Sequence, residues 1–319
     1  MTTLTSPADL LASVPFLIGY QPDESLVLVS LKEGAVSMAM RVDYPTENPT
    51  VGAIAGLIAH IMKDKAEGIL AIAYLPDGVA YEVGAELLAR ISVMARENDI
   101  KTEEALVVFN GRFRSSLCQD LACCPIEGNA IPDTQSARIT AELVADGKIV
   151  PPSSREELER DNTPTSEDYA EAVDRFKFRE SIDEGQAYRK AGALAIADWL
   201  ATGTQDPERL ALVIASLEDI QVRDYALGLD IPAEKLRELC LLAPMGFRAP
   251  IASLTAGAFY EAGNGALANH FLDVALTDVP NYSLGVLLRR VFGAGWPPAS
   301  FAEMRRELHP KVCEGIFGE

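Results

Sequence analysis

The segment Leu26-Val27-Leu28-Val29-Ser30-Leu31 decides the fold of this chain. It is a short apolar run rich in valine and leucine, and this pattern is typical of a strand buried inside a sheet. Lys32-Glu33-Gly34 then makes a tight connection, and the segment Val36–Val42 alternates with the period of two that a half-buried strand requires. The two runs therefore predict a β-hairpin at the start of the sheet.

Strand-like and helix-like segments alternate after this hairpin. Apolar runs at Ile69–Tyr74 and Ala105–Phe109 predict two further buried strands, and residues 49–65 and 81–97 are predicted to be helical. Crossovers through helices place successive strands parallel in one sheet, with the helices covering its faces. The first 150 residues therefore predict an α/β domain with a mixed sheet flanked by helices.

A helix is also predicted before the first strand. Ser6 is a favourable N-cap residue, Pro7 suits the first helical position, and Asp9 lies near the positive end of the helix dipole. We expect Pro15 to end this helix, because proline lacks the N–H that a helix interior uses. The predicted helix is therefore short.

The character of the sequence changes after residue 150. Residues 151–168 are rich in proline, serine and charged residues, which is typical of a linker, and their charged middle has the composition of a short helix. Residues 169–319 contain no comparable β-rich run and predict an all-helical domain. The candidate helices of the second half cover residues 166–201, 207–218, 233–242, 249–262, 265–277, 282–292 and 299–308.

One part of the helical half resembles a known repeat. Residues 252–280 resemble a single tetratricopeptide unit, in which two antiparallel helices pack closely. The residues that fit the motif are Ala256, Phe259, Gly263, Ala268, Leu272, Ala275 and Pro280. Ala252 replaces the tryptophan of the motif, and neighbouring segments do not repeat at its period. We therefore expect a helical hairpin; a peptide-binding array is the alternative, although arrays stack several units.

Charge and cysteine content restrict the partners and the location. The formal net charge is −19, with 20 acidic and 11 basic residues in 1–150 and 27 and 17 in 151–319, which argues against direct nucleic-acid binding. Five cysteines are few and odd in number, as in a reducing compartment. We expect no secretory signal in Met1–Ala12 and no membrane span, because no apolar run reaches about eighteen residues. The expected location is the cytoplasm.

The most unusual segment holds three of the five cysteines and follows a hairpin signal at Asn110-Gly111. Zinc sites usually combine two cysteine pairs, and no second pair lies near this one. Adjacent cysteines in an extended chain point in opposite directions, and the proline after them favours an extended backbone. We therefore expect no metal and no cofactor, and a disulfide from Cys118 is the alternative to free thiols. The predicted role is a structural clasp, packed against the sheet, made of Cys118, Asp120, Cys123, Cys124, Pro125, Glu127 and Gly128.

This segment resembles the signature C-x-D-x-x-C-C-P-x-E-G of an actinobacterial family described as domain of unknown function 4192. The resemblance extends to Ala8–Pro15, Gly19–Pro22, Ser25–Val27, Arg41–Asp43 and Asp278–Leu284. The lead of the signature departs from the family, since Phe113, Arg114 and Ser116 stand where tryptophan or tyrosine is usual. The resemblance implies a bacterial or phage origin and an intracellular protein. It implies no activity and no catalytic residues.

Residues for a ligand site are sought at the ends of predicted strands. The sequence has no phosphate-binding loop, nucleophile elbow or metalloprotease motif, and each of its three histidines has a structural interpretation. Ligands of α/β sheets gather at the carboxyl ends of parallel strands, and arginine pairs suit phosphate or carboxylate groups. The candidates are Asp23, Glu24, Ser25, Arg41, Asp43, Arg112 and Arg114. Surface ion pairs are the alternative interpretation of these residues.

Three functional hypotheses follow from these patterns. The first is a binding or adaptor protein without an evident catalytic site, which binds a protein partner or associates with itself. The second is an α/β protein that binds a nucleotide or a small phosphorylated ligand and is in that case a possible enzyme. The third is a phage-encoded acidic decoy of a host DNA-binding protein. Convergence of Arg41, Asp43, Arg112 and the cysteine segment would favour the second, because it would form a pocket with charged walls.

Overall fold

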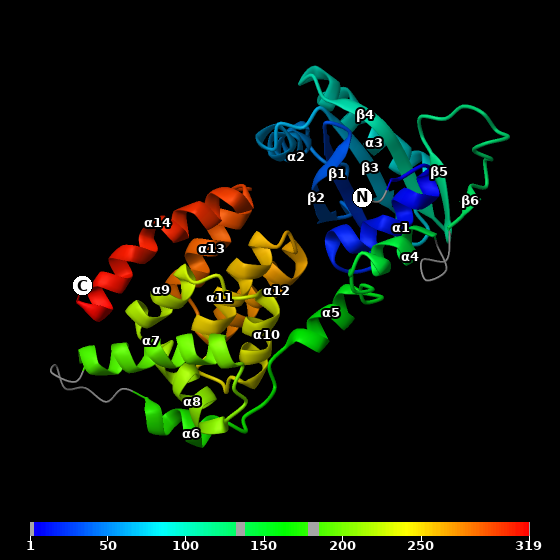
Figure 1. Ribbon diagram of the computed structural model, residues 1–319. Coiled ribbons are helices and arrows are strands. Elements are labelled where there is room, and N and C mark those ends of the chain that lie inside the picture. Colours follow the sequence, from blue (N-terminus) through cyan, green and yellow to red (C-terminus); the bar gives the residue numbers. More distant parts are fainter. Residues whose placement is uncertain (1–2, 132–137, 178–184, 319) are drawn as a thin grey trace. The chain divides into compact units, whose positions relative to one another are not determined.

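A six-stranded mixed sheet forms the centre of the N-terminal half, in the order β2-β1-β3-β4-β5-β6 (Figure 1). The computed structural model describes residues 3–131, 138–177 and 185–318. The strands are β1 (Ser25–Lys32), β2 (Ala35–Asp43), β3 (Gly68–Tyr74), β4 (Lys101–Phe109), β5 (Arg112–Ser115) and β6 (Asn129–Ala130). The helices of this half are α1 (Pro7–Ile18), α2 (Val51–Lys63), α3 (Tyr81–Glu97) and α4 (Arg138–Ala145). The predicted fold class is confirmed.

Two tight turns and one crossover determine the strand directions. β1 is antiparallel to both β2 and β3, whereas β3 and β4 are parallel and are joined through α3. Glu33-Gly34 and Asn110-Gly111 have φ angles of 52°, 76°, 47° and 69°, so all four residues are left-handed. This is the turn geometry that matches the twist of two antiparallel strands. The two hairpins that the sequence predicts are therefore confirmed.

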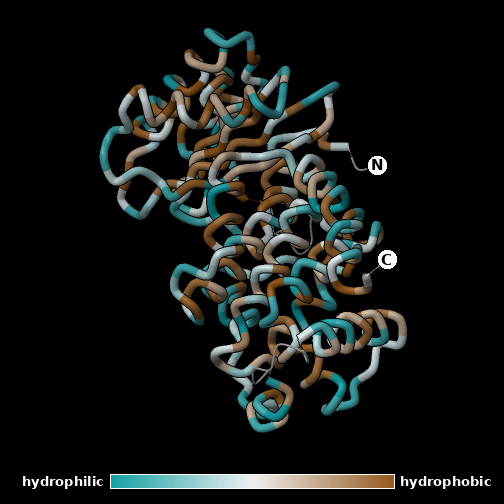
Figure 2. The backbone as a smooth tube through the Cα atoms, turned by 90° about the vertical axis from the view of Figure 1, so that its left-hand side faces the viewer, coloured by the Kyte–Doolittle hydropathy of each residue, from teal (hydrophilic) through white to brown (hydrophobic). Residues whose placement is uncertain are grey.

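One face of the sheet packs on α2 and α3. Leu28, Ala71 and Ala105 lie opposite one another on β1, β3 and β4, and they join a buried cluster with Ile58 of α2 and Ile91 of α3. Figure 2 shows the hydrophobic residues concentrated along the strands of this half. Thr50 caps α2, since its hydroxyl accepts the N–H of Ala53. The strands that the apolar runs predict thus form the centre of the core.

The other face of the sheet lies against α1, and α4 packs on α1. α1 contacts β2 and α4, and Arg138 of α4 forms an ion pair of 3.0 Å with Asp9 of α1. The prediction that Pro15 ends α1 is wrong, because the helix continues to Ile18. Proline at position 15 removes one N–H, and its own carbonyl oxygen accepts the N–H of left-handed Gly19. α4 was not predicted from the sequence.

The second half of the chain is entirely helical among its described residues. The chain divides into the units Met1–Leu158 and Glu159–Glu319, and the division lies within α5, inside the predicted linker 151–168. The helices are α5 (Arg155–Asn162), α6 (Ala170–Phe176), α7 (Gly185–Thr202), α8 (Pro207–Ser216), α9 (Ile220–Gly228), α10 (Ala233–Leu242), α11 (Arg248–Glu261), α12 (Gly265–Asp278), α13 (Ser283–Gly293) and α14 (Pro298–Phe317). Within the described ranges, no helix combines the length and apolar character that a bilayer span needs.

Several helix bounds differ from the predictions. The predicted helix 166–201 contains α6 and α7 as separate helices, and residues 178–184 lie outside the described residues. α9 was not predicted. α14 extends well past residue 308, with Pro310 inside it, because Phe301 and Ile316 are buried near its two ends and hold the helix across the lost hydrogen bond.

α11 and α12 form the helical hairpin predicted for residues 252–280. Ala256, Ala268 and Ala275 are completely buried, as close helix packing requires. The rings of Phe259 and Phe271 stack with their centroids 5.8 Å apart and an angle of 6° between their planes. The hairpin is therefore present, and its relation to tetratricopeptide repeats stays a prediction.

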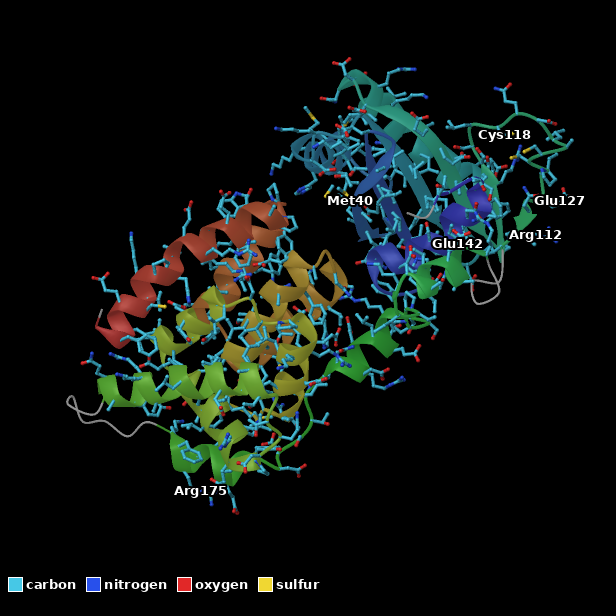
Figure 3. All side chains as sticks on the ribbon, in the orientation of Figure 1. Met40, Arg112, Cys118, Glu127, Glu142 and Arg175 are labelled. Atoms are coloured by element: carbon cyan, nitrogen blue, oxygen red, sulfur yellow. The ribbon has the colours of Figure 1, made fainter. Side chains whose placement is uncertain are left out.

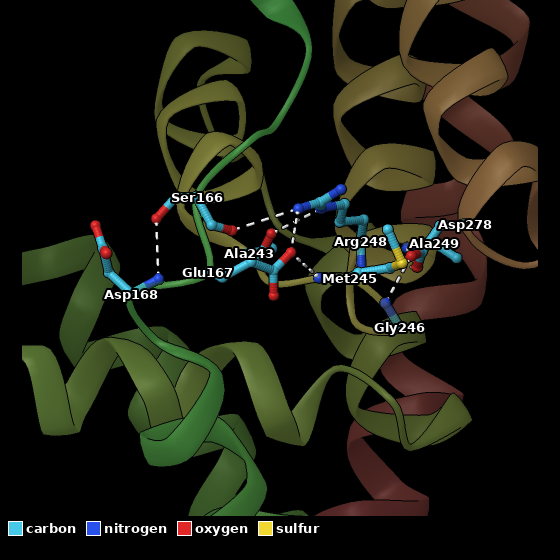
Figure 4. Close-up of polar contacts among 9 residues, drawn as sticks. All are labelled: Ser166, Glu167, Asp168, Ala243, Met245, Gly246, Arg248, Ala249 and Asp278. Carbon is cyan, nitrogen blue, oxygen red and sulfur yellow. Dashed lines mark hydrogen bonds and ion pairs between the residues drawn. The ribbon is translucent and has the colours of Figure 1, made fainter.

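The carboxylate of Asp278 holds the start of α11 (Figure 4). It accepts the backbone N–H groups of Gly246, Arg248 and Ala249 at 2.6, 2.9 and 2.9 Å. The Arg248 side chain in turn donates to Glu167 at 2.8 Å and to the carbonyl of Ala243 at 2.9 Å. The segment before α6 is thereby joined to the α11–α12 pair. This gives Asp278, the first residue of the family-like segment 278–284, a structural role.

Replacing Asp278 by alanine should lower the free energy of unfolding of the helical unit by about 2 kcal/mol, the upper range for a lost helix cap, because three N–H groups lose their acceptor. Urea denaturation monitored by fluorescence measures this, since Trp199 and Trp296 both lie in this unit. Asp273→Ala on the same helix removes an exposed ion pair with Arg289 and should cost less than about 0.5 kcal/mol. Equal losses in the two variants would contradict the capping role.

Candidate thiol site at the edge of the sheet

The predicted ligand residues lie at two separate places in the sheet. Arg41 and Asp43 belong to β2, at one end of the strand order, whereas Arg112 and Arg114 belong to β5. β1, β3 and β4 lie between them, which corresponds to roughly 19 Å at the usual strand spacing. In Figure 3, Met40 of β2 lies near one edge of the sheet, whereas Arg112 and Cys118 lie toward the other edge. The charged pocket that convergence would have formed is therefore not present.

The group at β2 is a local ion pair with a turn. Arg41 donates to the carboxylate of Asp43 and, at 3.4 Å, to the carbonyl oxygen of Asp23. The carboxylate of Asp23 accepts the N–H of Glu24 at 2.9 Å. Ser25 is completely buried in β1, opposite Asp43. The structure thus brings these five residues together. The two terminal nitrogen atoms of the Arg41 guanidinium group donate to acceptors of the protein itself.

The two arginines of β5 act separately. Arg112 donates through Nη1 to the carbonyl oxygen of Gly128 at 2.9 Å. The guanidinium group of Arg114 lies 4.8 Å from the ring centre of Tyr81, the first residue of α3. Arg112 therefore holds the end of the cysteine segment, and Arg114 stacks on an aromatic ring. Neither contact resembles a paired clamp for an anion.

The segment from Cys118 to Gly128 is a folded loop that leaves β5 and returns to it through β6. The N–H of Cys124 donates to the carbonyl oxygen of Asp120 at 2.7 Å, and the Asp120 carboxylate accepts the N–H of Ala122 at 2.9 Å. Asn129 of β6 donates through its side chain to the carbonyl of Cys123 at 3.0 Å. The two sides of the loop are therefore joined by hydrogen bonds.

Gly128 closes the loop in a conformation that favours glycine. Its φ is 78°, and a Cβ at this position would lie 3.0 Å from the carbonyl oxygen of Phe113 and 3.2 Å from the Cβ of Arg112. Other residues would meet both a left-handed backbone and a close neighbouring strand. Of the remaining predicted clasp residues, Pro125 is half-buried and Glu127 is exposed.

Three thiols gather inside this loop. The sulfur atoms of Cys118, Cys123 and Cys124 all lie within 4.8 Å of one another. Cys124 is buried, Cys118 is half-buried and Cys123 is exposed. The sequence argument that Cys123 and Cys124 point apart is wrong, because it assumed an extended backbone, and a hydrogen-bonded turn stands there instead. Figure 3 labels Cys118 in this loop, together with Arg112 and Glu127.

The electrostatic surroundings keep the buried thiol neutral. Burial raises the pKa of Cys124 to about 11, and hydrogen bonds with the thiols of Cys118 and Cys123 act in the same direction. The N–H of Ser115, which donates to the Cys124 sulfur, acts in the opposite direction. Reactive cysteines have a lowered pKa, so Cys124 lacks the character of a nucleophile. The arrangement is instead suited to holding a soft cation or to forming a disulfide.

The loop also presents large apolar side chains to solvent. Leu117, Leu121 and Ile126 have exposed fractions of 48%, 56% and 69%. These three residues were not among the predicted site residues, although the sequence shows leucine and isoleucine inside a segment rich in cysteine, proline and glycine. Exposed apolar groups on an anchored loop differ from scattered surface residues, because their positions are fixed relative to one another.

Comparison with known proteins gives a family but no activity. The family model described as "Domain of unknown function (DUF4192)" matches residues 7–299, and this range includes the sheet and the cysteine loop together with most of the helical unit. No curated protein matches the sequence, and no solved structure matches the fold.

Proposed function

The chain belongs to the DUF4192 family, and from this starting point we propose that it is a binding or adaptor protein. Its docking surface is the loop Leu117–Gly128, and the partner is another protein. The observation that carries the proposal is the exposure of Leu117, Leu121 and Ile126 on this one loop. Exposed apolar side chains that gather at one place and are bordered by polar residues mark sites of protein–protein interaction.

The anchoring of the loop supports this role. The bonds from Asn129 to Cys123 and from Arg112 to Gly128 fix the returning side of the loop to strands of the sheet. A surface that is ordered before binding loses less conformational entropy when the partner docks. Three apolar anchors on a fixed frame are therefore better suited to a specific partner than the same residues on an unstructured segment would be.

Charge indicates the chemistry of the partner. The carboxylates of Asp120 and Glu127 are exposed beside the apolar side chains, and the whole chain carries a net charge of −19. A partner with an apolar pocket bordered by lysine or arginine would complement both features. A second copy of the chain would bring the same negative charge, so like-charge repulsion disfavours self-association. The occupant that we propose is a different protein with a basic border.

The test compares a loop variant with a surface control in the same unit. Leu121→Ser with Ile126→Ser removes two anchors, and Val83→Ser with Val93→Ser removes two exposed apolar side chains of α3. Each protein is used as bait in an extract of the native host, and an enriched protein is then purified and titrated against all three baits. We expect the loop variant to bind at least about tenfold more weakly, the size of a single hot spot, and the control to bind like the wild type.

Two outcomes would overturn the proposal. One is equal affinity of the purified partner for the loop variant and the wild type. The other is a partner that turns out to be a second copy of this chain, which size-exclusion chromatography with light scattering would reveal. Salt screens exposed charges, so an affinity that does not change with salt concentration would contradict the basic border of the partner. It would leave the docking role of the loop unaffected.

In favour of the nucleotide-binding alternative, the buried Nε of Arg41 and the hydroxyl of Ser25 have no partner in the described part of the chain, but the predicted arginines do not converge. Its candidate residues lie on β2 and β5, and Arg41 is engaged by Asp43 and by the carbonyl of Asp23. A thermal-shift screen with nucleotides and phosphorylated metabolites would still detect such an activity. A ligand at a hundred times its Kd stabilises the folded state by about 2.7 kcal/mol.

A further inference from the structure

We propose that Cys118, Cys123 and Cys124 bind one zinc ion through their three sulfur atoms. This site goes beyond the docking role, because it concerns the thiols inside the loop, whereas docking concerns the apolar side chains on its surface. The two can be tested separately, since no anchor residue is a metal ligand.

The spacing of the sulfur atoms fits a zinc ion. Zinc–sulfur bonds of about 2.3 Å in a tetrahedral arrangement place the sulfurs roughly 3.8 Å apart. The three sulfur atoms already lie within 4.8 Å of one another. The largest of these separations exceeds the sulfur–sulfur distance around a zinc ion by only about 1 Å. A cluster of three thiols at this spacing is close to a ready-made coordination shell.

The donor set selects the type of ion. Thiolate ligands favour zinc and other soft cations, whereas magnesium and calcium require oxygen ligands. Among the described residues, the cluster of potential ligands at this place consists of the three cysteines alone. Zinc bound by three protein ligands keeps a fourth position for water or for an incoming donor. Exposed Cys123 lies on the solvent side and provides the path by which the ion enters.

The surrounding backbone supports the site from outside. The N–H of Ser115 donates to the sulfur of Cys124, and such a bond stabilises a metal-bound thiolate and fixes its orientation. The turn from Asp120 to Cys124 holds the adjacent cysteines on one side of the loop. Arg112 of β5 donates to the carbonyl oxygen of Gly128 and so holds the end of the loop that carries the thiols.

The ion would join the two sides of the loop. Cys118 lies just after β5, and Cys123 and Cys124 lie on the returning side. Replacing three S–H bonds by three S–Zn bonds releases three protons and changes no oxidation state. The ion therefore requires no oxidant, and it takes the place of a disulfide in a reducing compartment.

The test uses the full-length protein, reduced and freed of metal with a chelator. Cobalt(II) is titrated in first, because its thiolate charge-transfer band reports sulfur ligation, and zinc(II) is then added to displace it. We expect one cobalt ion per chain, displaced by one zinc ion. Cys123→Ser should weaken zinc binding by at least about 100-fold, more than the loss of an outer-shell partner. Cys123 is exposed, so this variant should keep its fold.

The controls separate this site from other thiols and from docking. Cys313→Ser lies in the helical unit and should leave the cobalt band unchanged. The Leu121→Ser, Ile126→Ser variant should bind zinc like the wild type. If Cys124→Ser fails to fold, the cobalt band and the zinc affinity of Cys118→Ser and Cys123→Ser still test the site. A missing cobalt band, a band that survives in both of these variants, or a Cys118 disulfide that remains after reduction would overturn the zinc site.

Discussion

Replacing Phe271 by alanine should lower the free energy of unfolding of the helical unit by about 3–5 kcal/mol. Phe271 is completely buried, and its ring stacks on that of Phe259 between α11 and α12. Truncation to alanine loses the transfer free energy of the ring and leaves a cavity that the two packed helices fill only partly. The cost is large because α11 and α12 share the most extensive helix–helix contact in the described chain.

Urea denaturation followed by tryptophan fluorescence measures this effect in the helical unit, where Trp199 is buried and Trp296 is more exposed. Phe271→Leu keeps most of the apolar volume and should cost less than about 1.5 kcal/mol. Leu287→Ala, at an exposed position of α13, should cost less than about 0.5 kcal/mol. A loss below about 1 kcal/mol for Phe271→Ala would show that this pair of helices does not depend on the stacked rings.

Replacing Gly128 by alanine should destabilise the sheet unit by about 2–5 kcal/mol. A left-handed backbone costs a residue with a Cβ about 1–2 kcal/mol. The close approach to the carbonyl of Phe113 and to Arg112 adds about 1–3 kcal/mol of overpacking. Both effects act at the point where the cysteine loop returns to β5, so the amides of β5 should exchange with solvent faster than in the wild type.

The matched control is Gly111→Ala. Gly111 has a similar φ of 69°, but a Cβ there would have no neighbour within 4 Å. This variant should therefore show the backbone cost alone, about 1–2 kcal/mol. Hydrogen exchange of the sheet amides in increasing urea measures both variants, because the tryptophans lie in the other unit. Equal losses would mean that the close contact with β5 contributes nothing.

The sheet could be predicted because its strands are read from local patterns. The run Leu26–Leu31 and the turn at Asn110-Gly111 each determine their own structure, and the sheet forms where they indicate. α9 could not be predicted, because its buried face includes Arg223, which donates to the hydroxyl of Tyr282 at 3.2 Å. A buried arginine interrupts the apolar spacing, and one of its partners, Tyr282, is distant in the sequence. Tertiary contacts determine such a helix.

The three cysteines of the candidate site could be predicted from the sequence, but the arrangement of their sulfur atoms could not. The three cysteines stand out in the sequence, but the bond from Cys124 to the carbonyl of Asp120 turns the backbone and brings the sulfurs together. The separation of Arg41 from Arg112 depends on the strand order, which crossover connections set and which no local pattern contains. The exposure of the loop leucines and isoleucine likewise depends on how the folded loop is presented.

The strand register has a consequence for the order in which this sheet assembles. β1 with β2 and β4 with β5 are joined by two-residue turns, so each pair closes over a short stretch of chain. The central pairings, Leu31 with Gly68 and Gly68 with Lys101, connect segments that a whole helix separates. Closing a longer loop costs more entropy and takes longer. We therefore expect the two hairpins to form early and the insertion of β3 between them to set the folding rate of this unit.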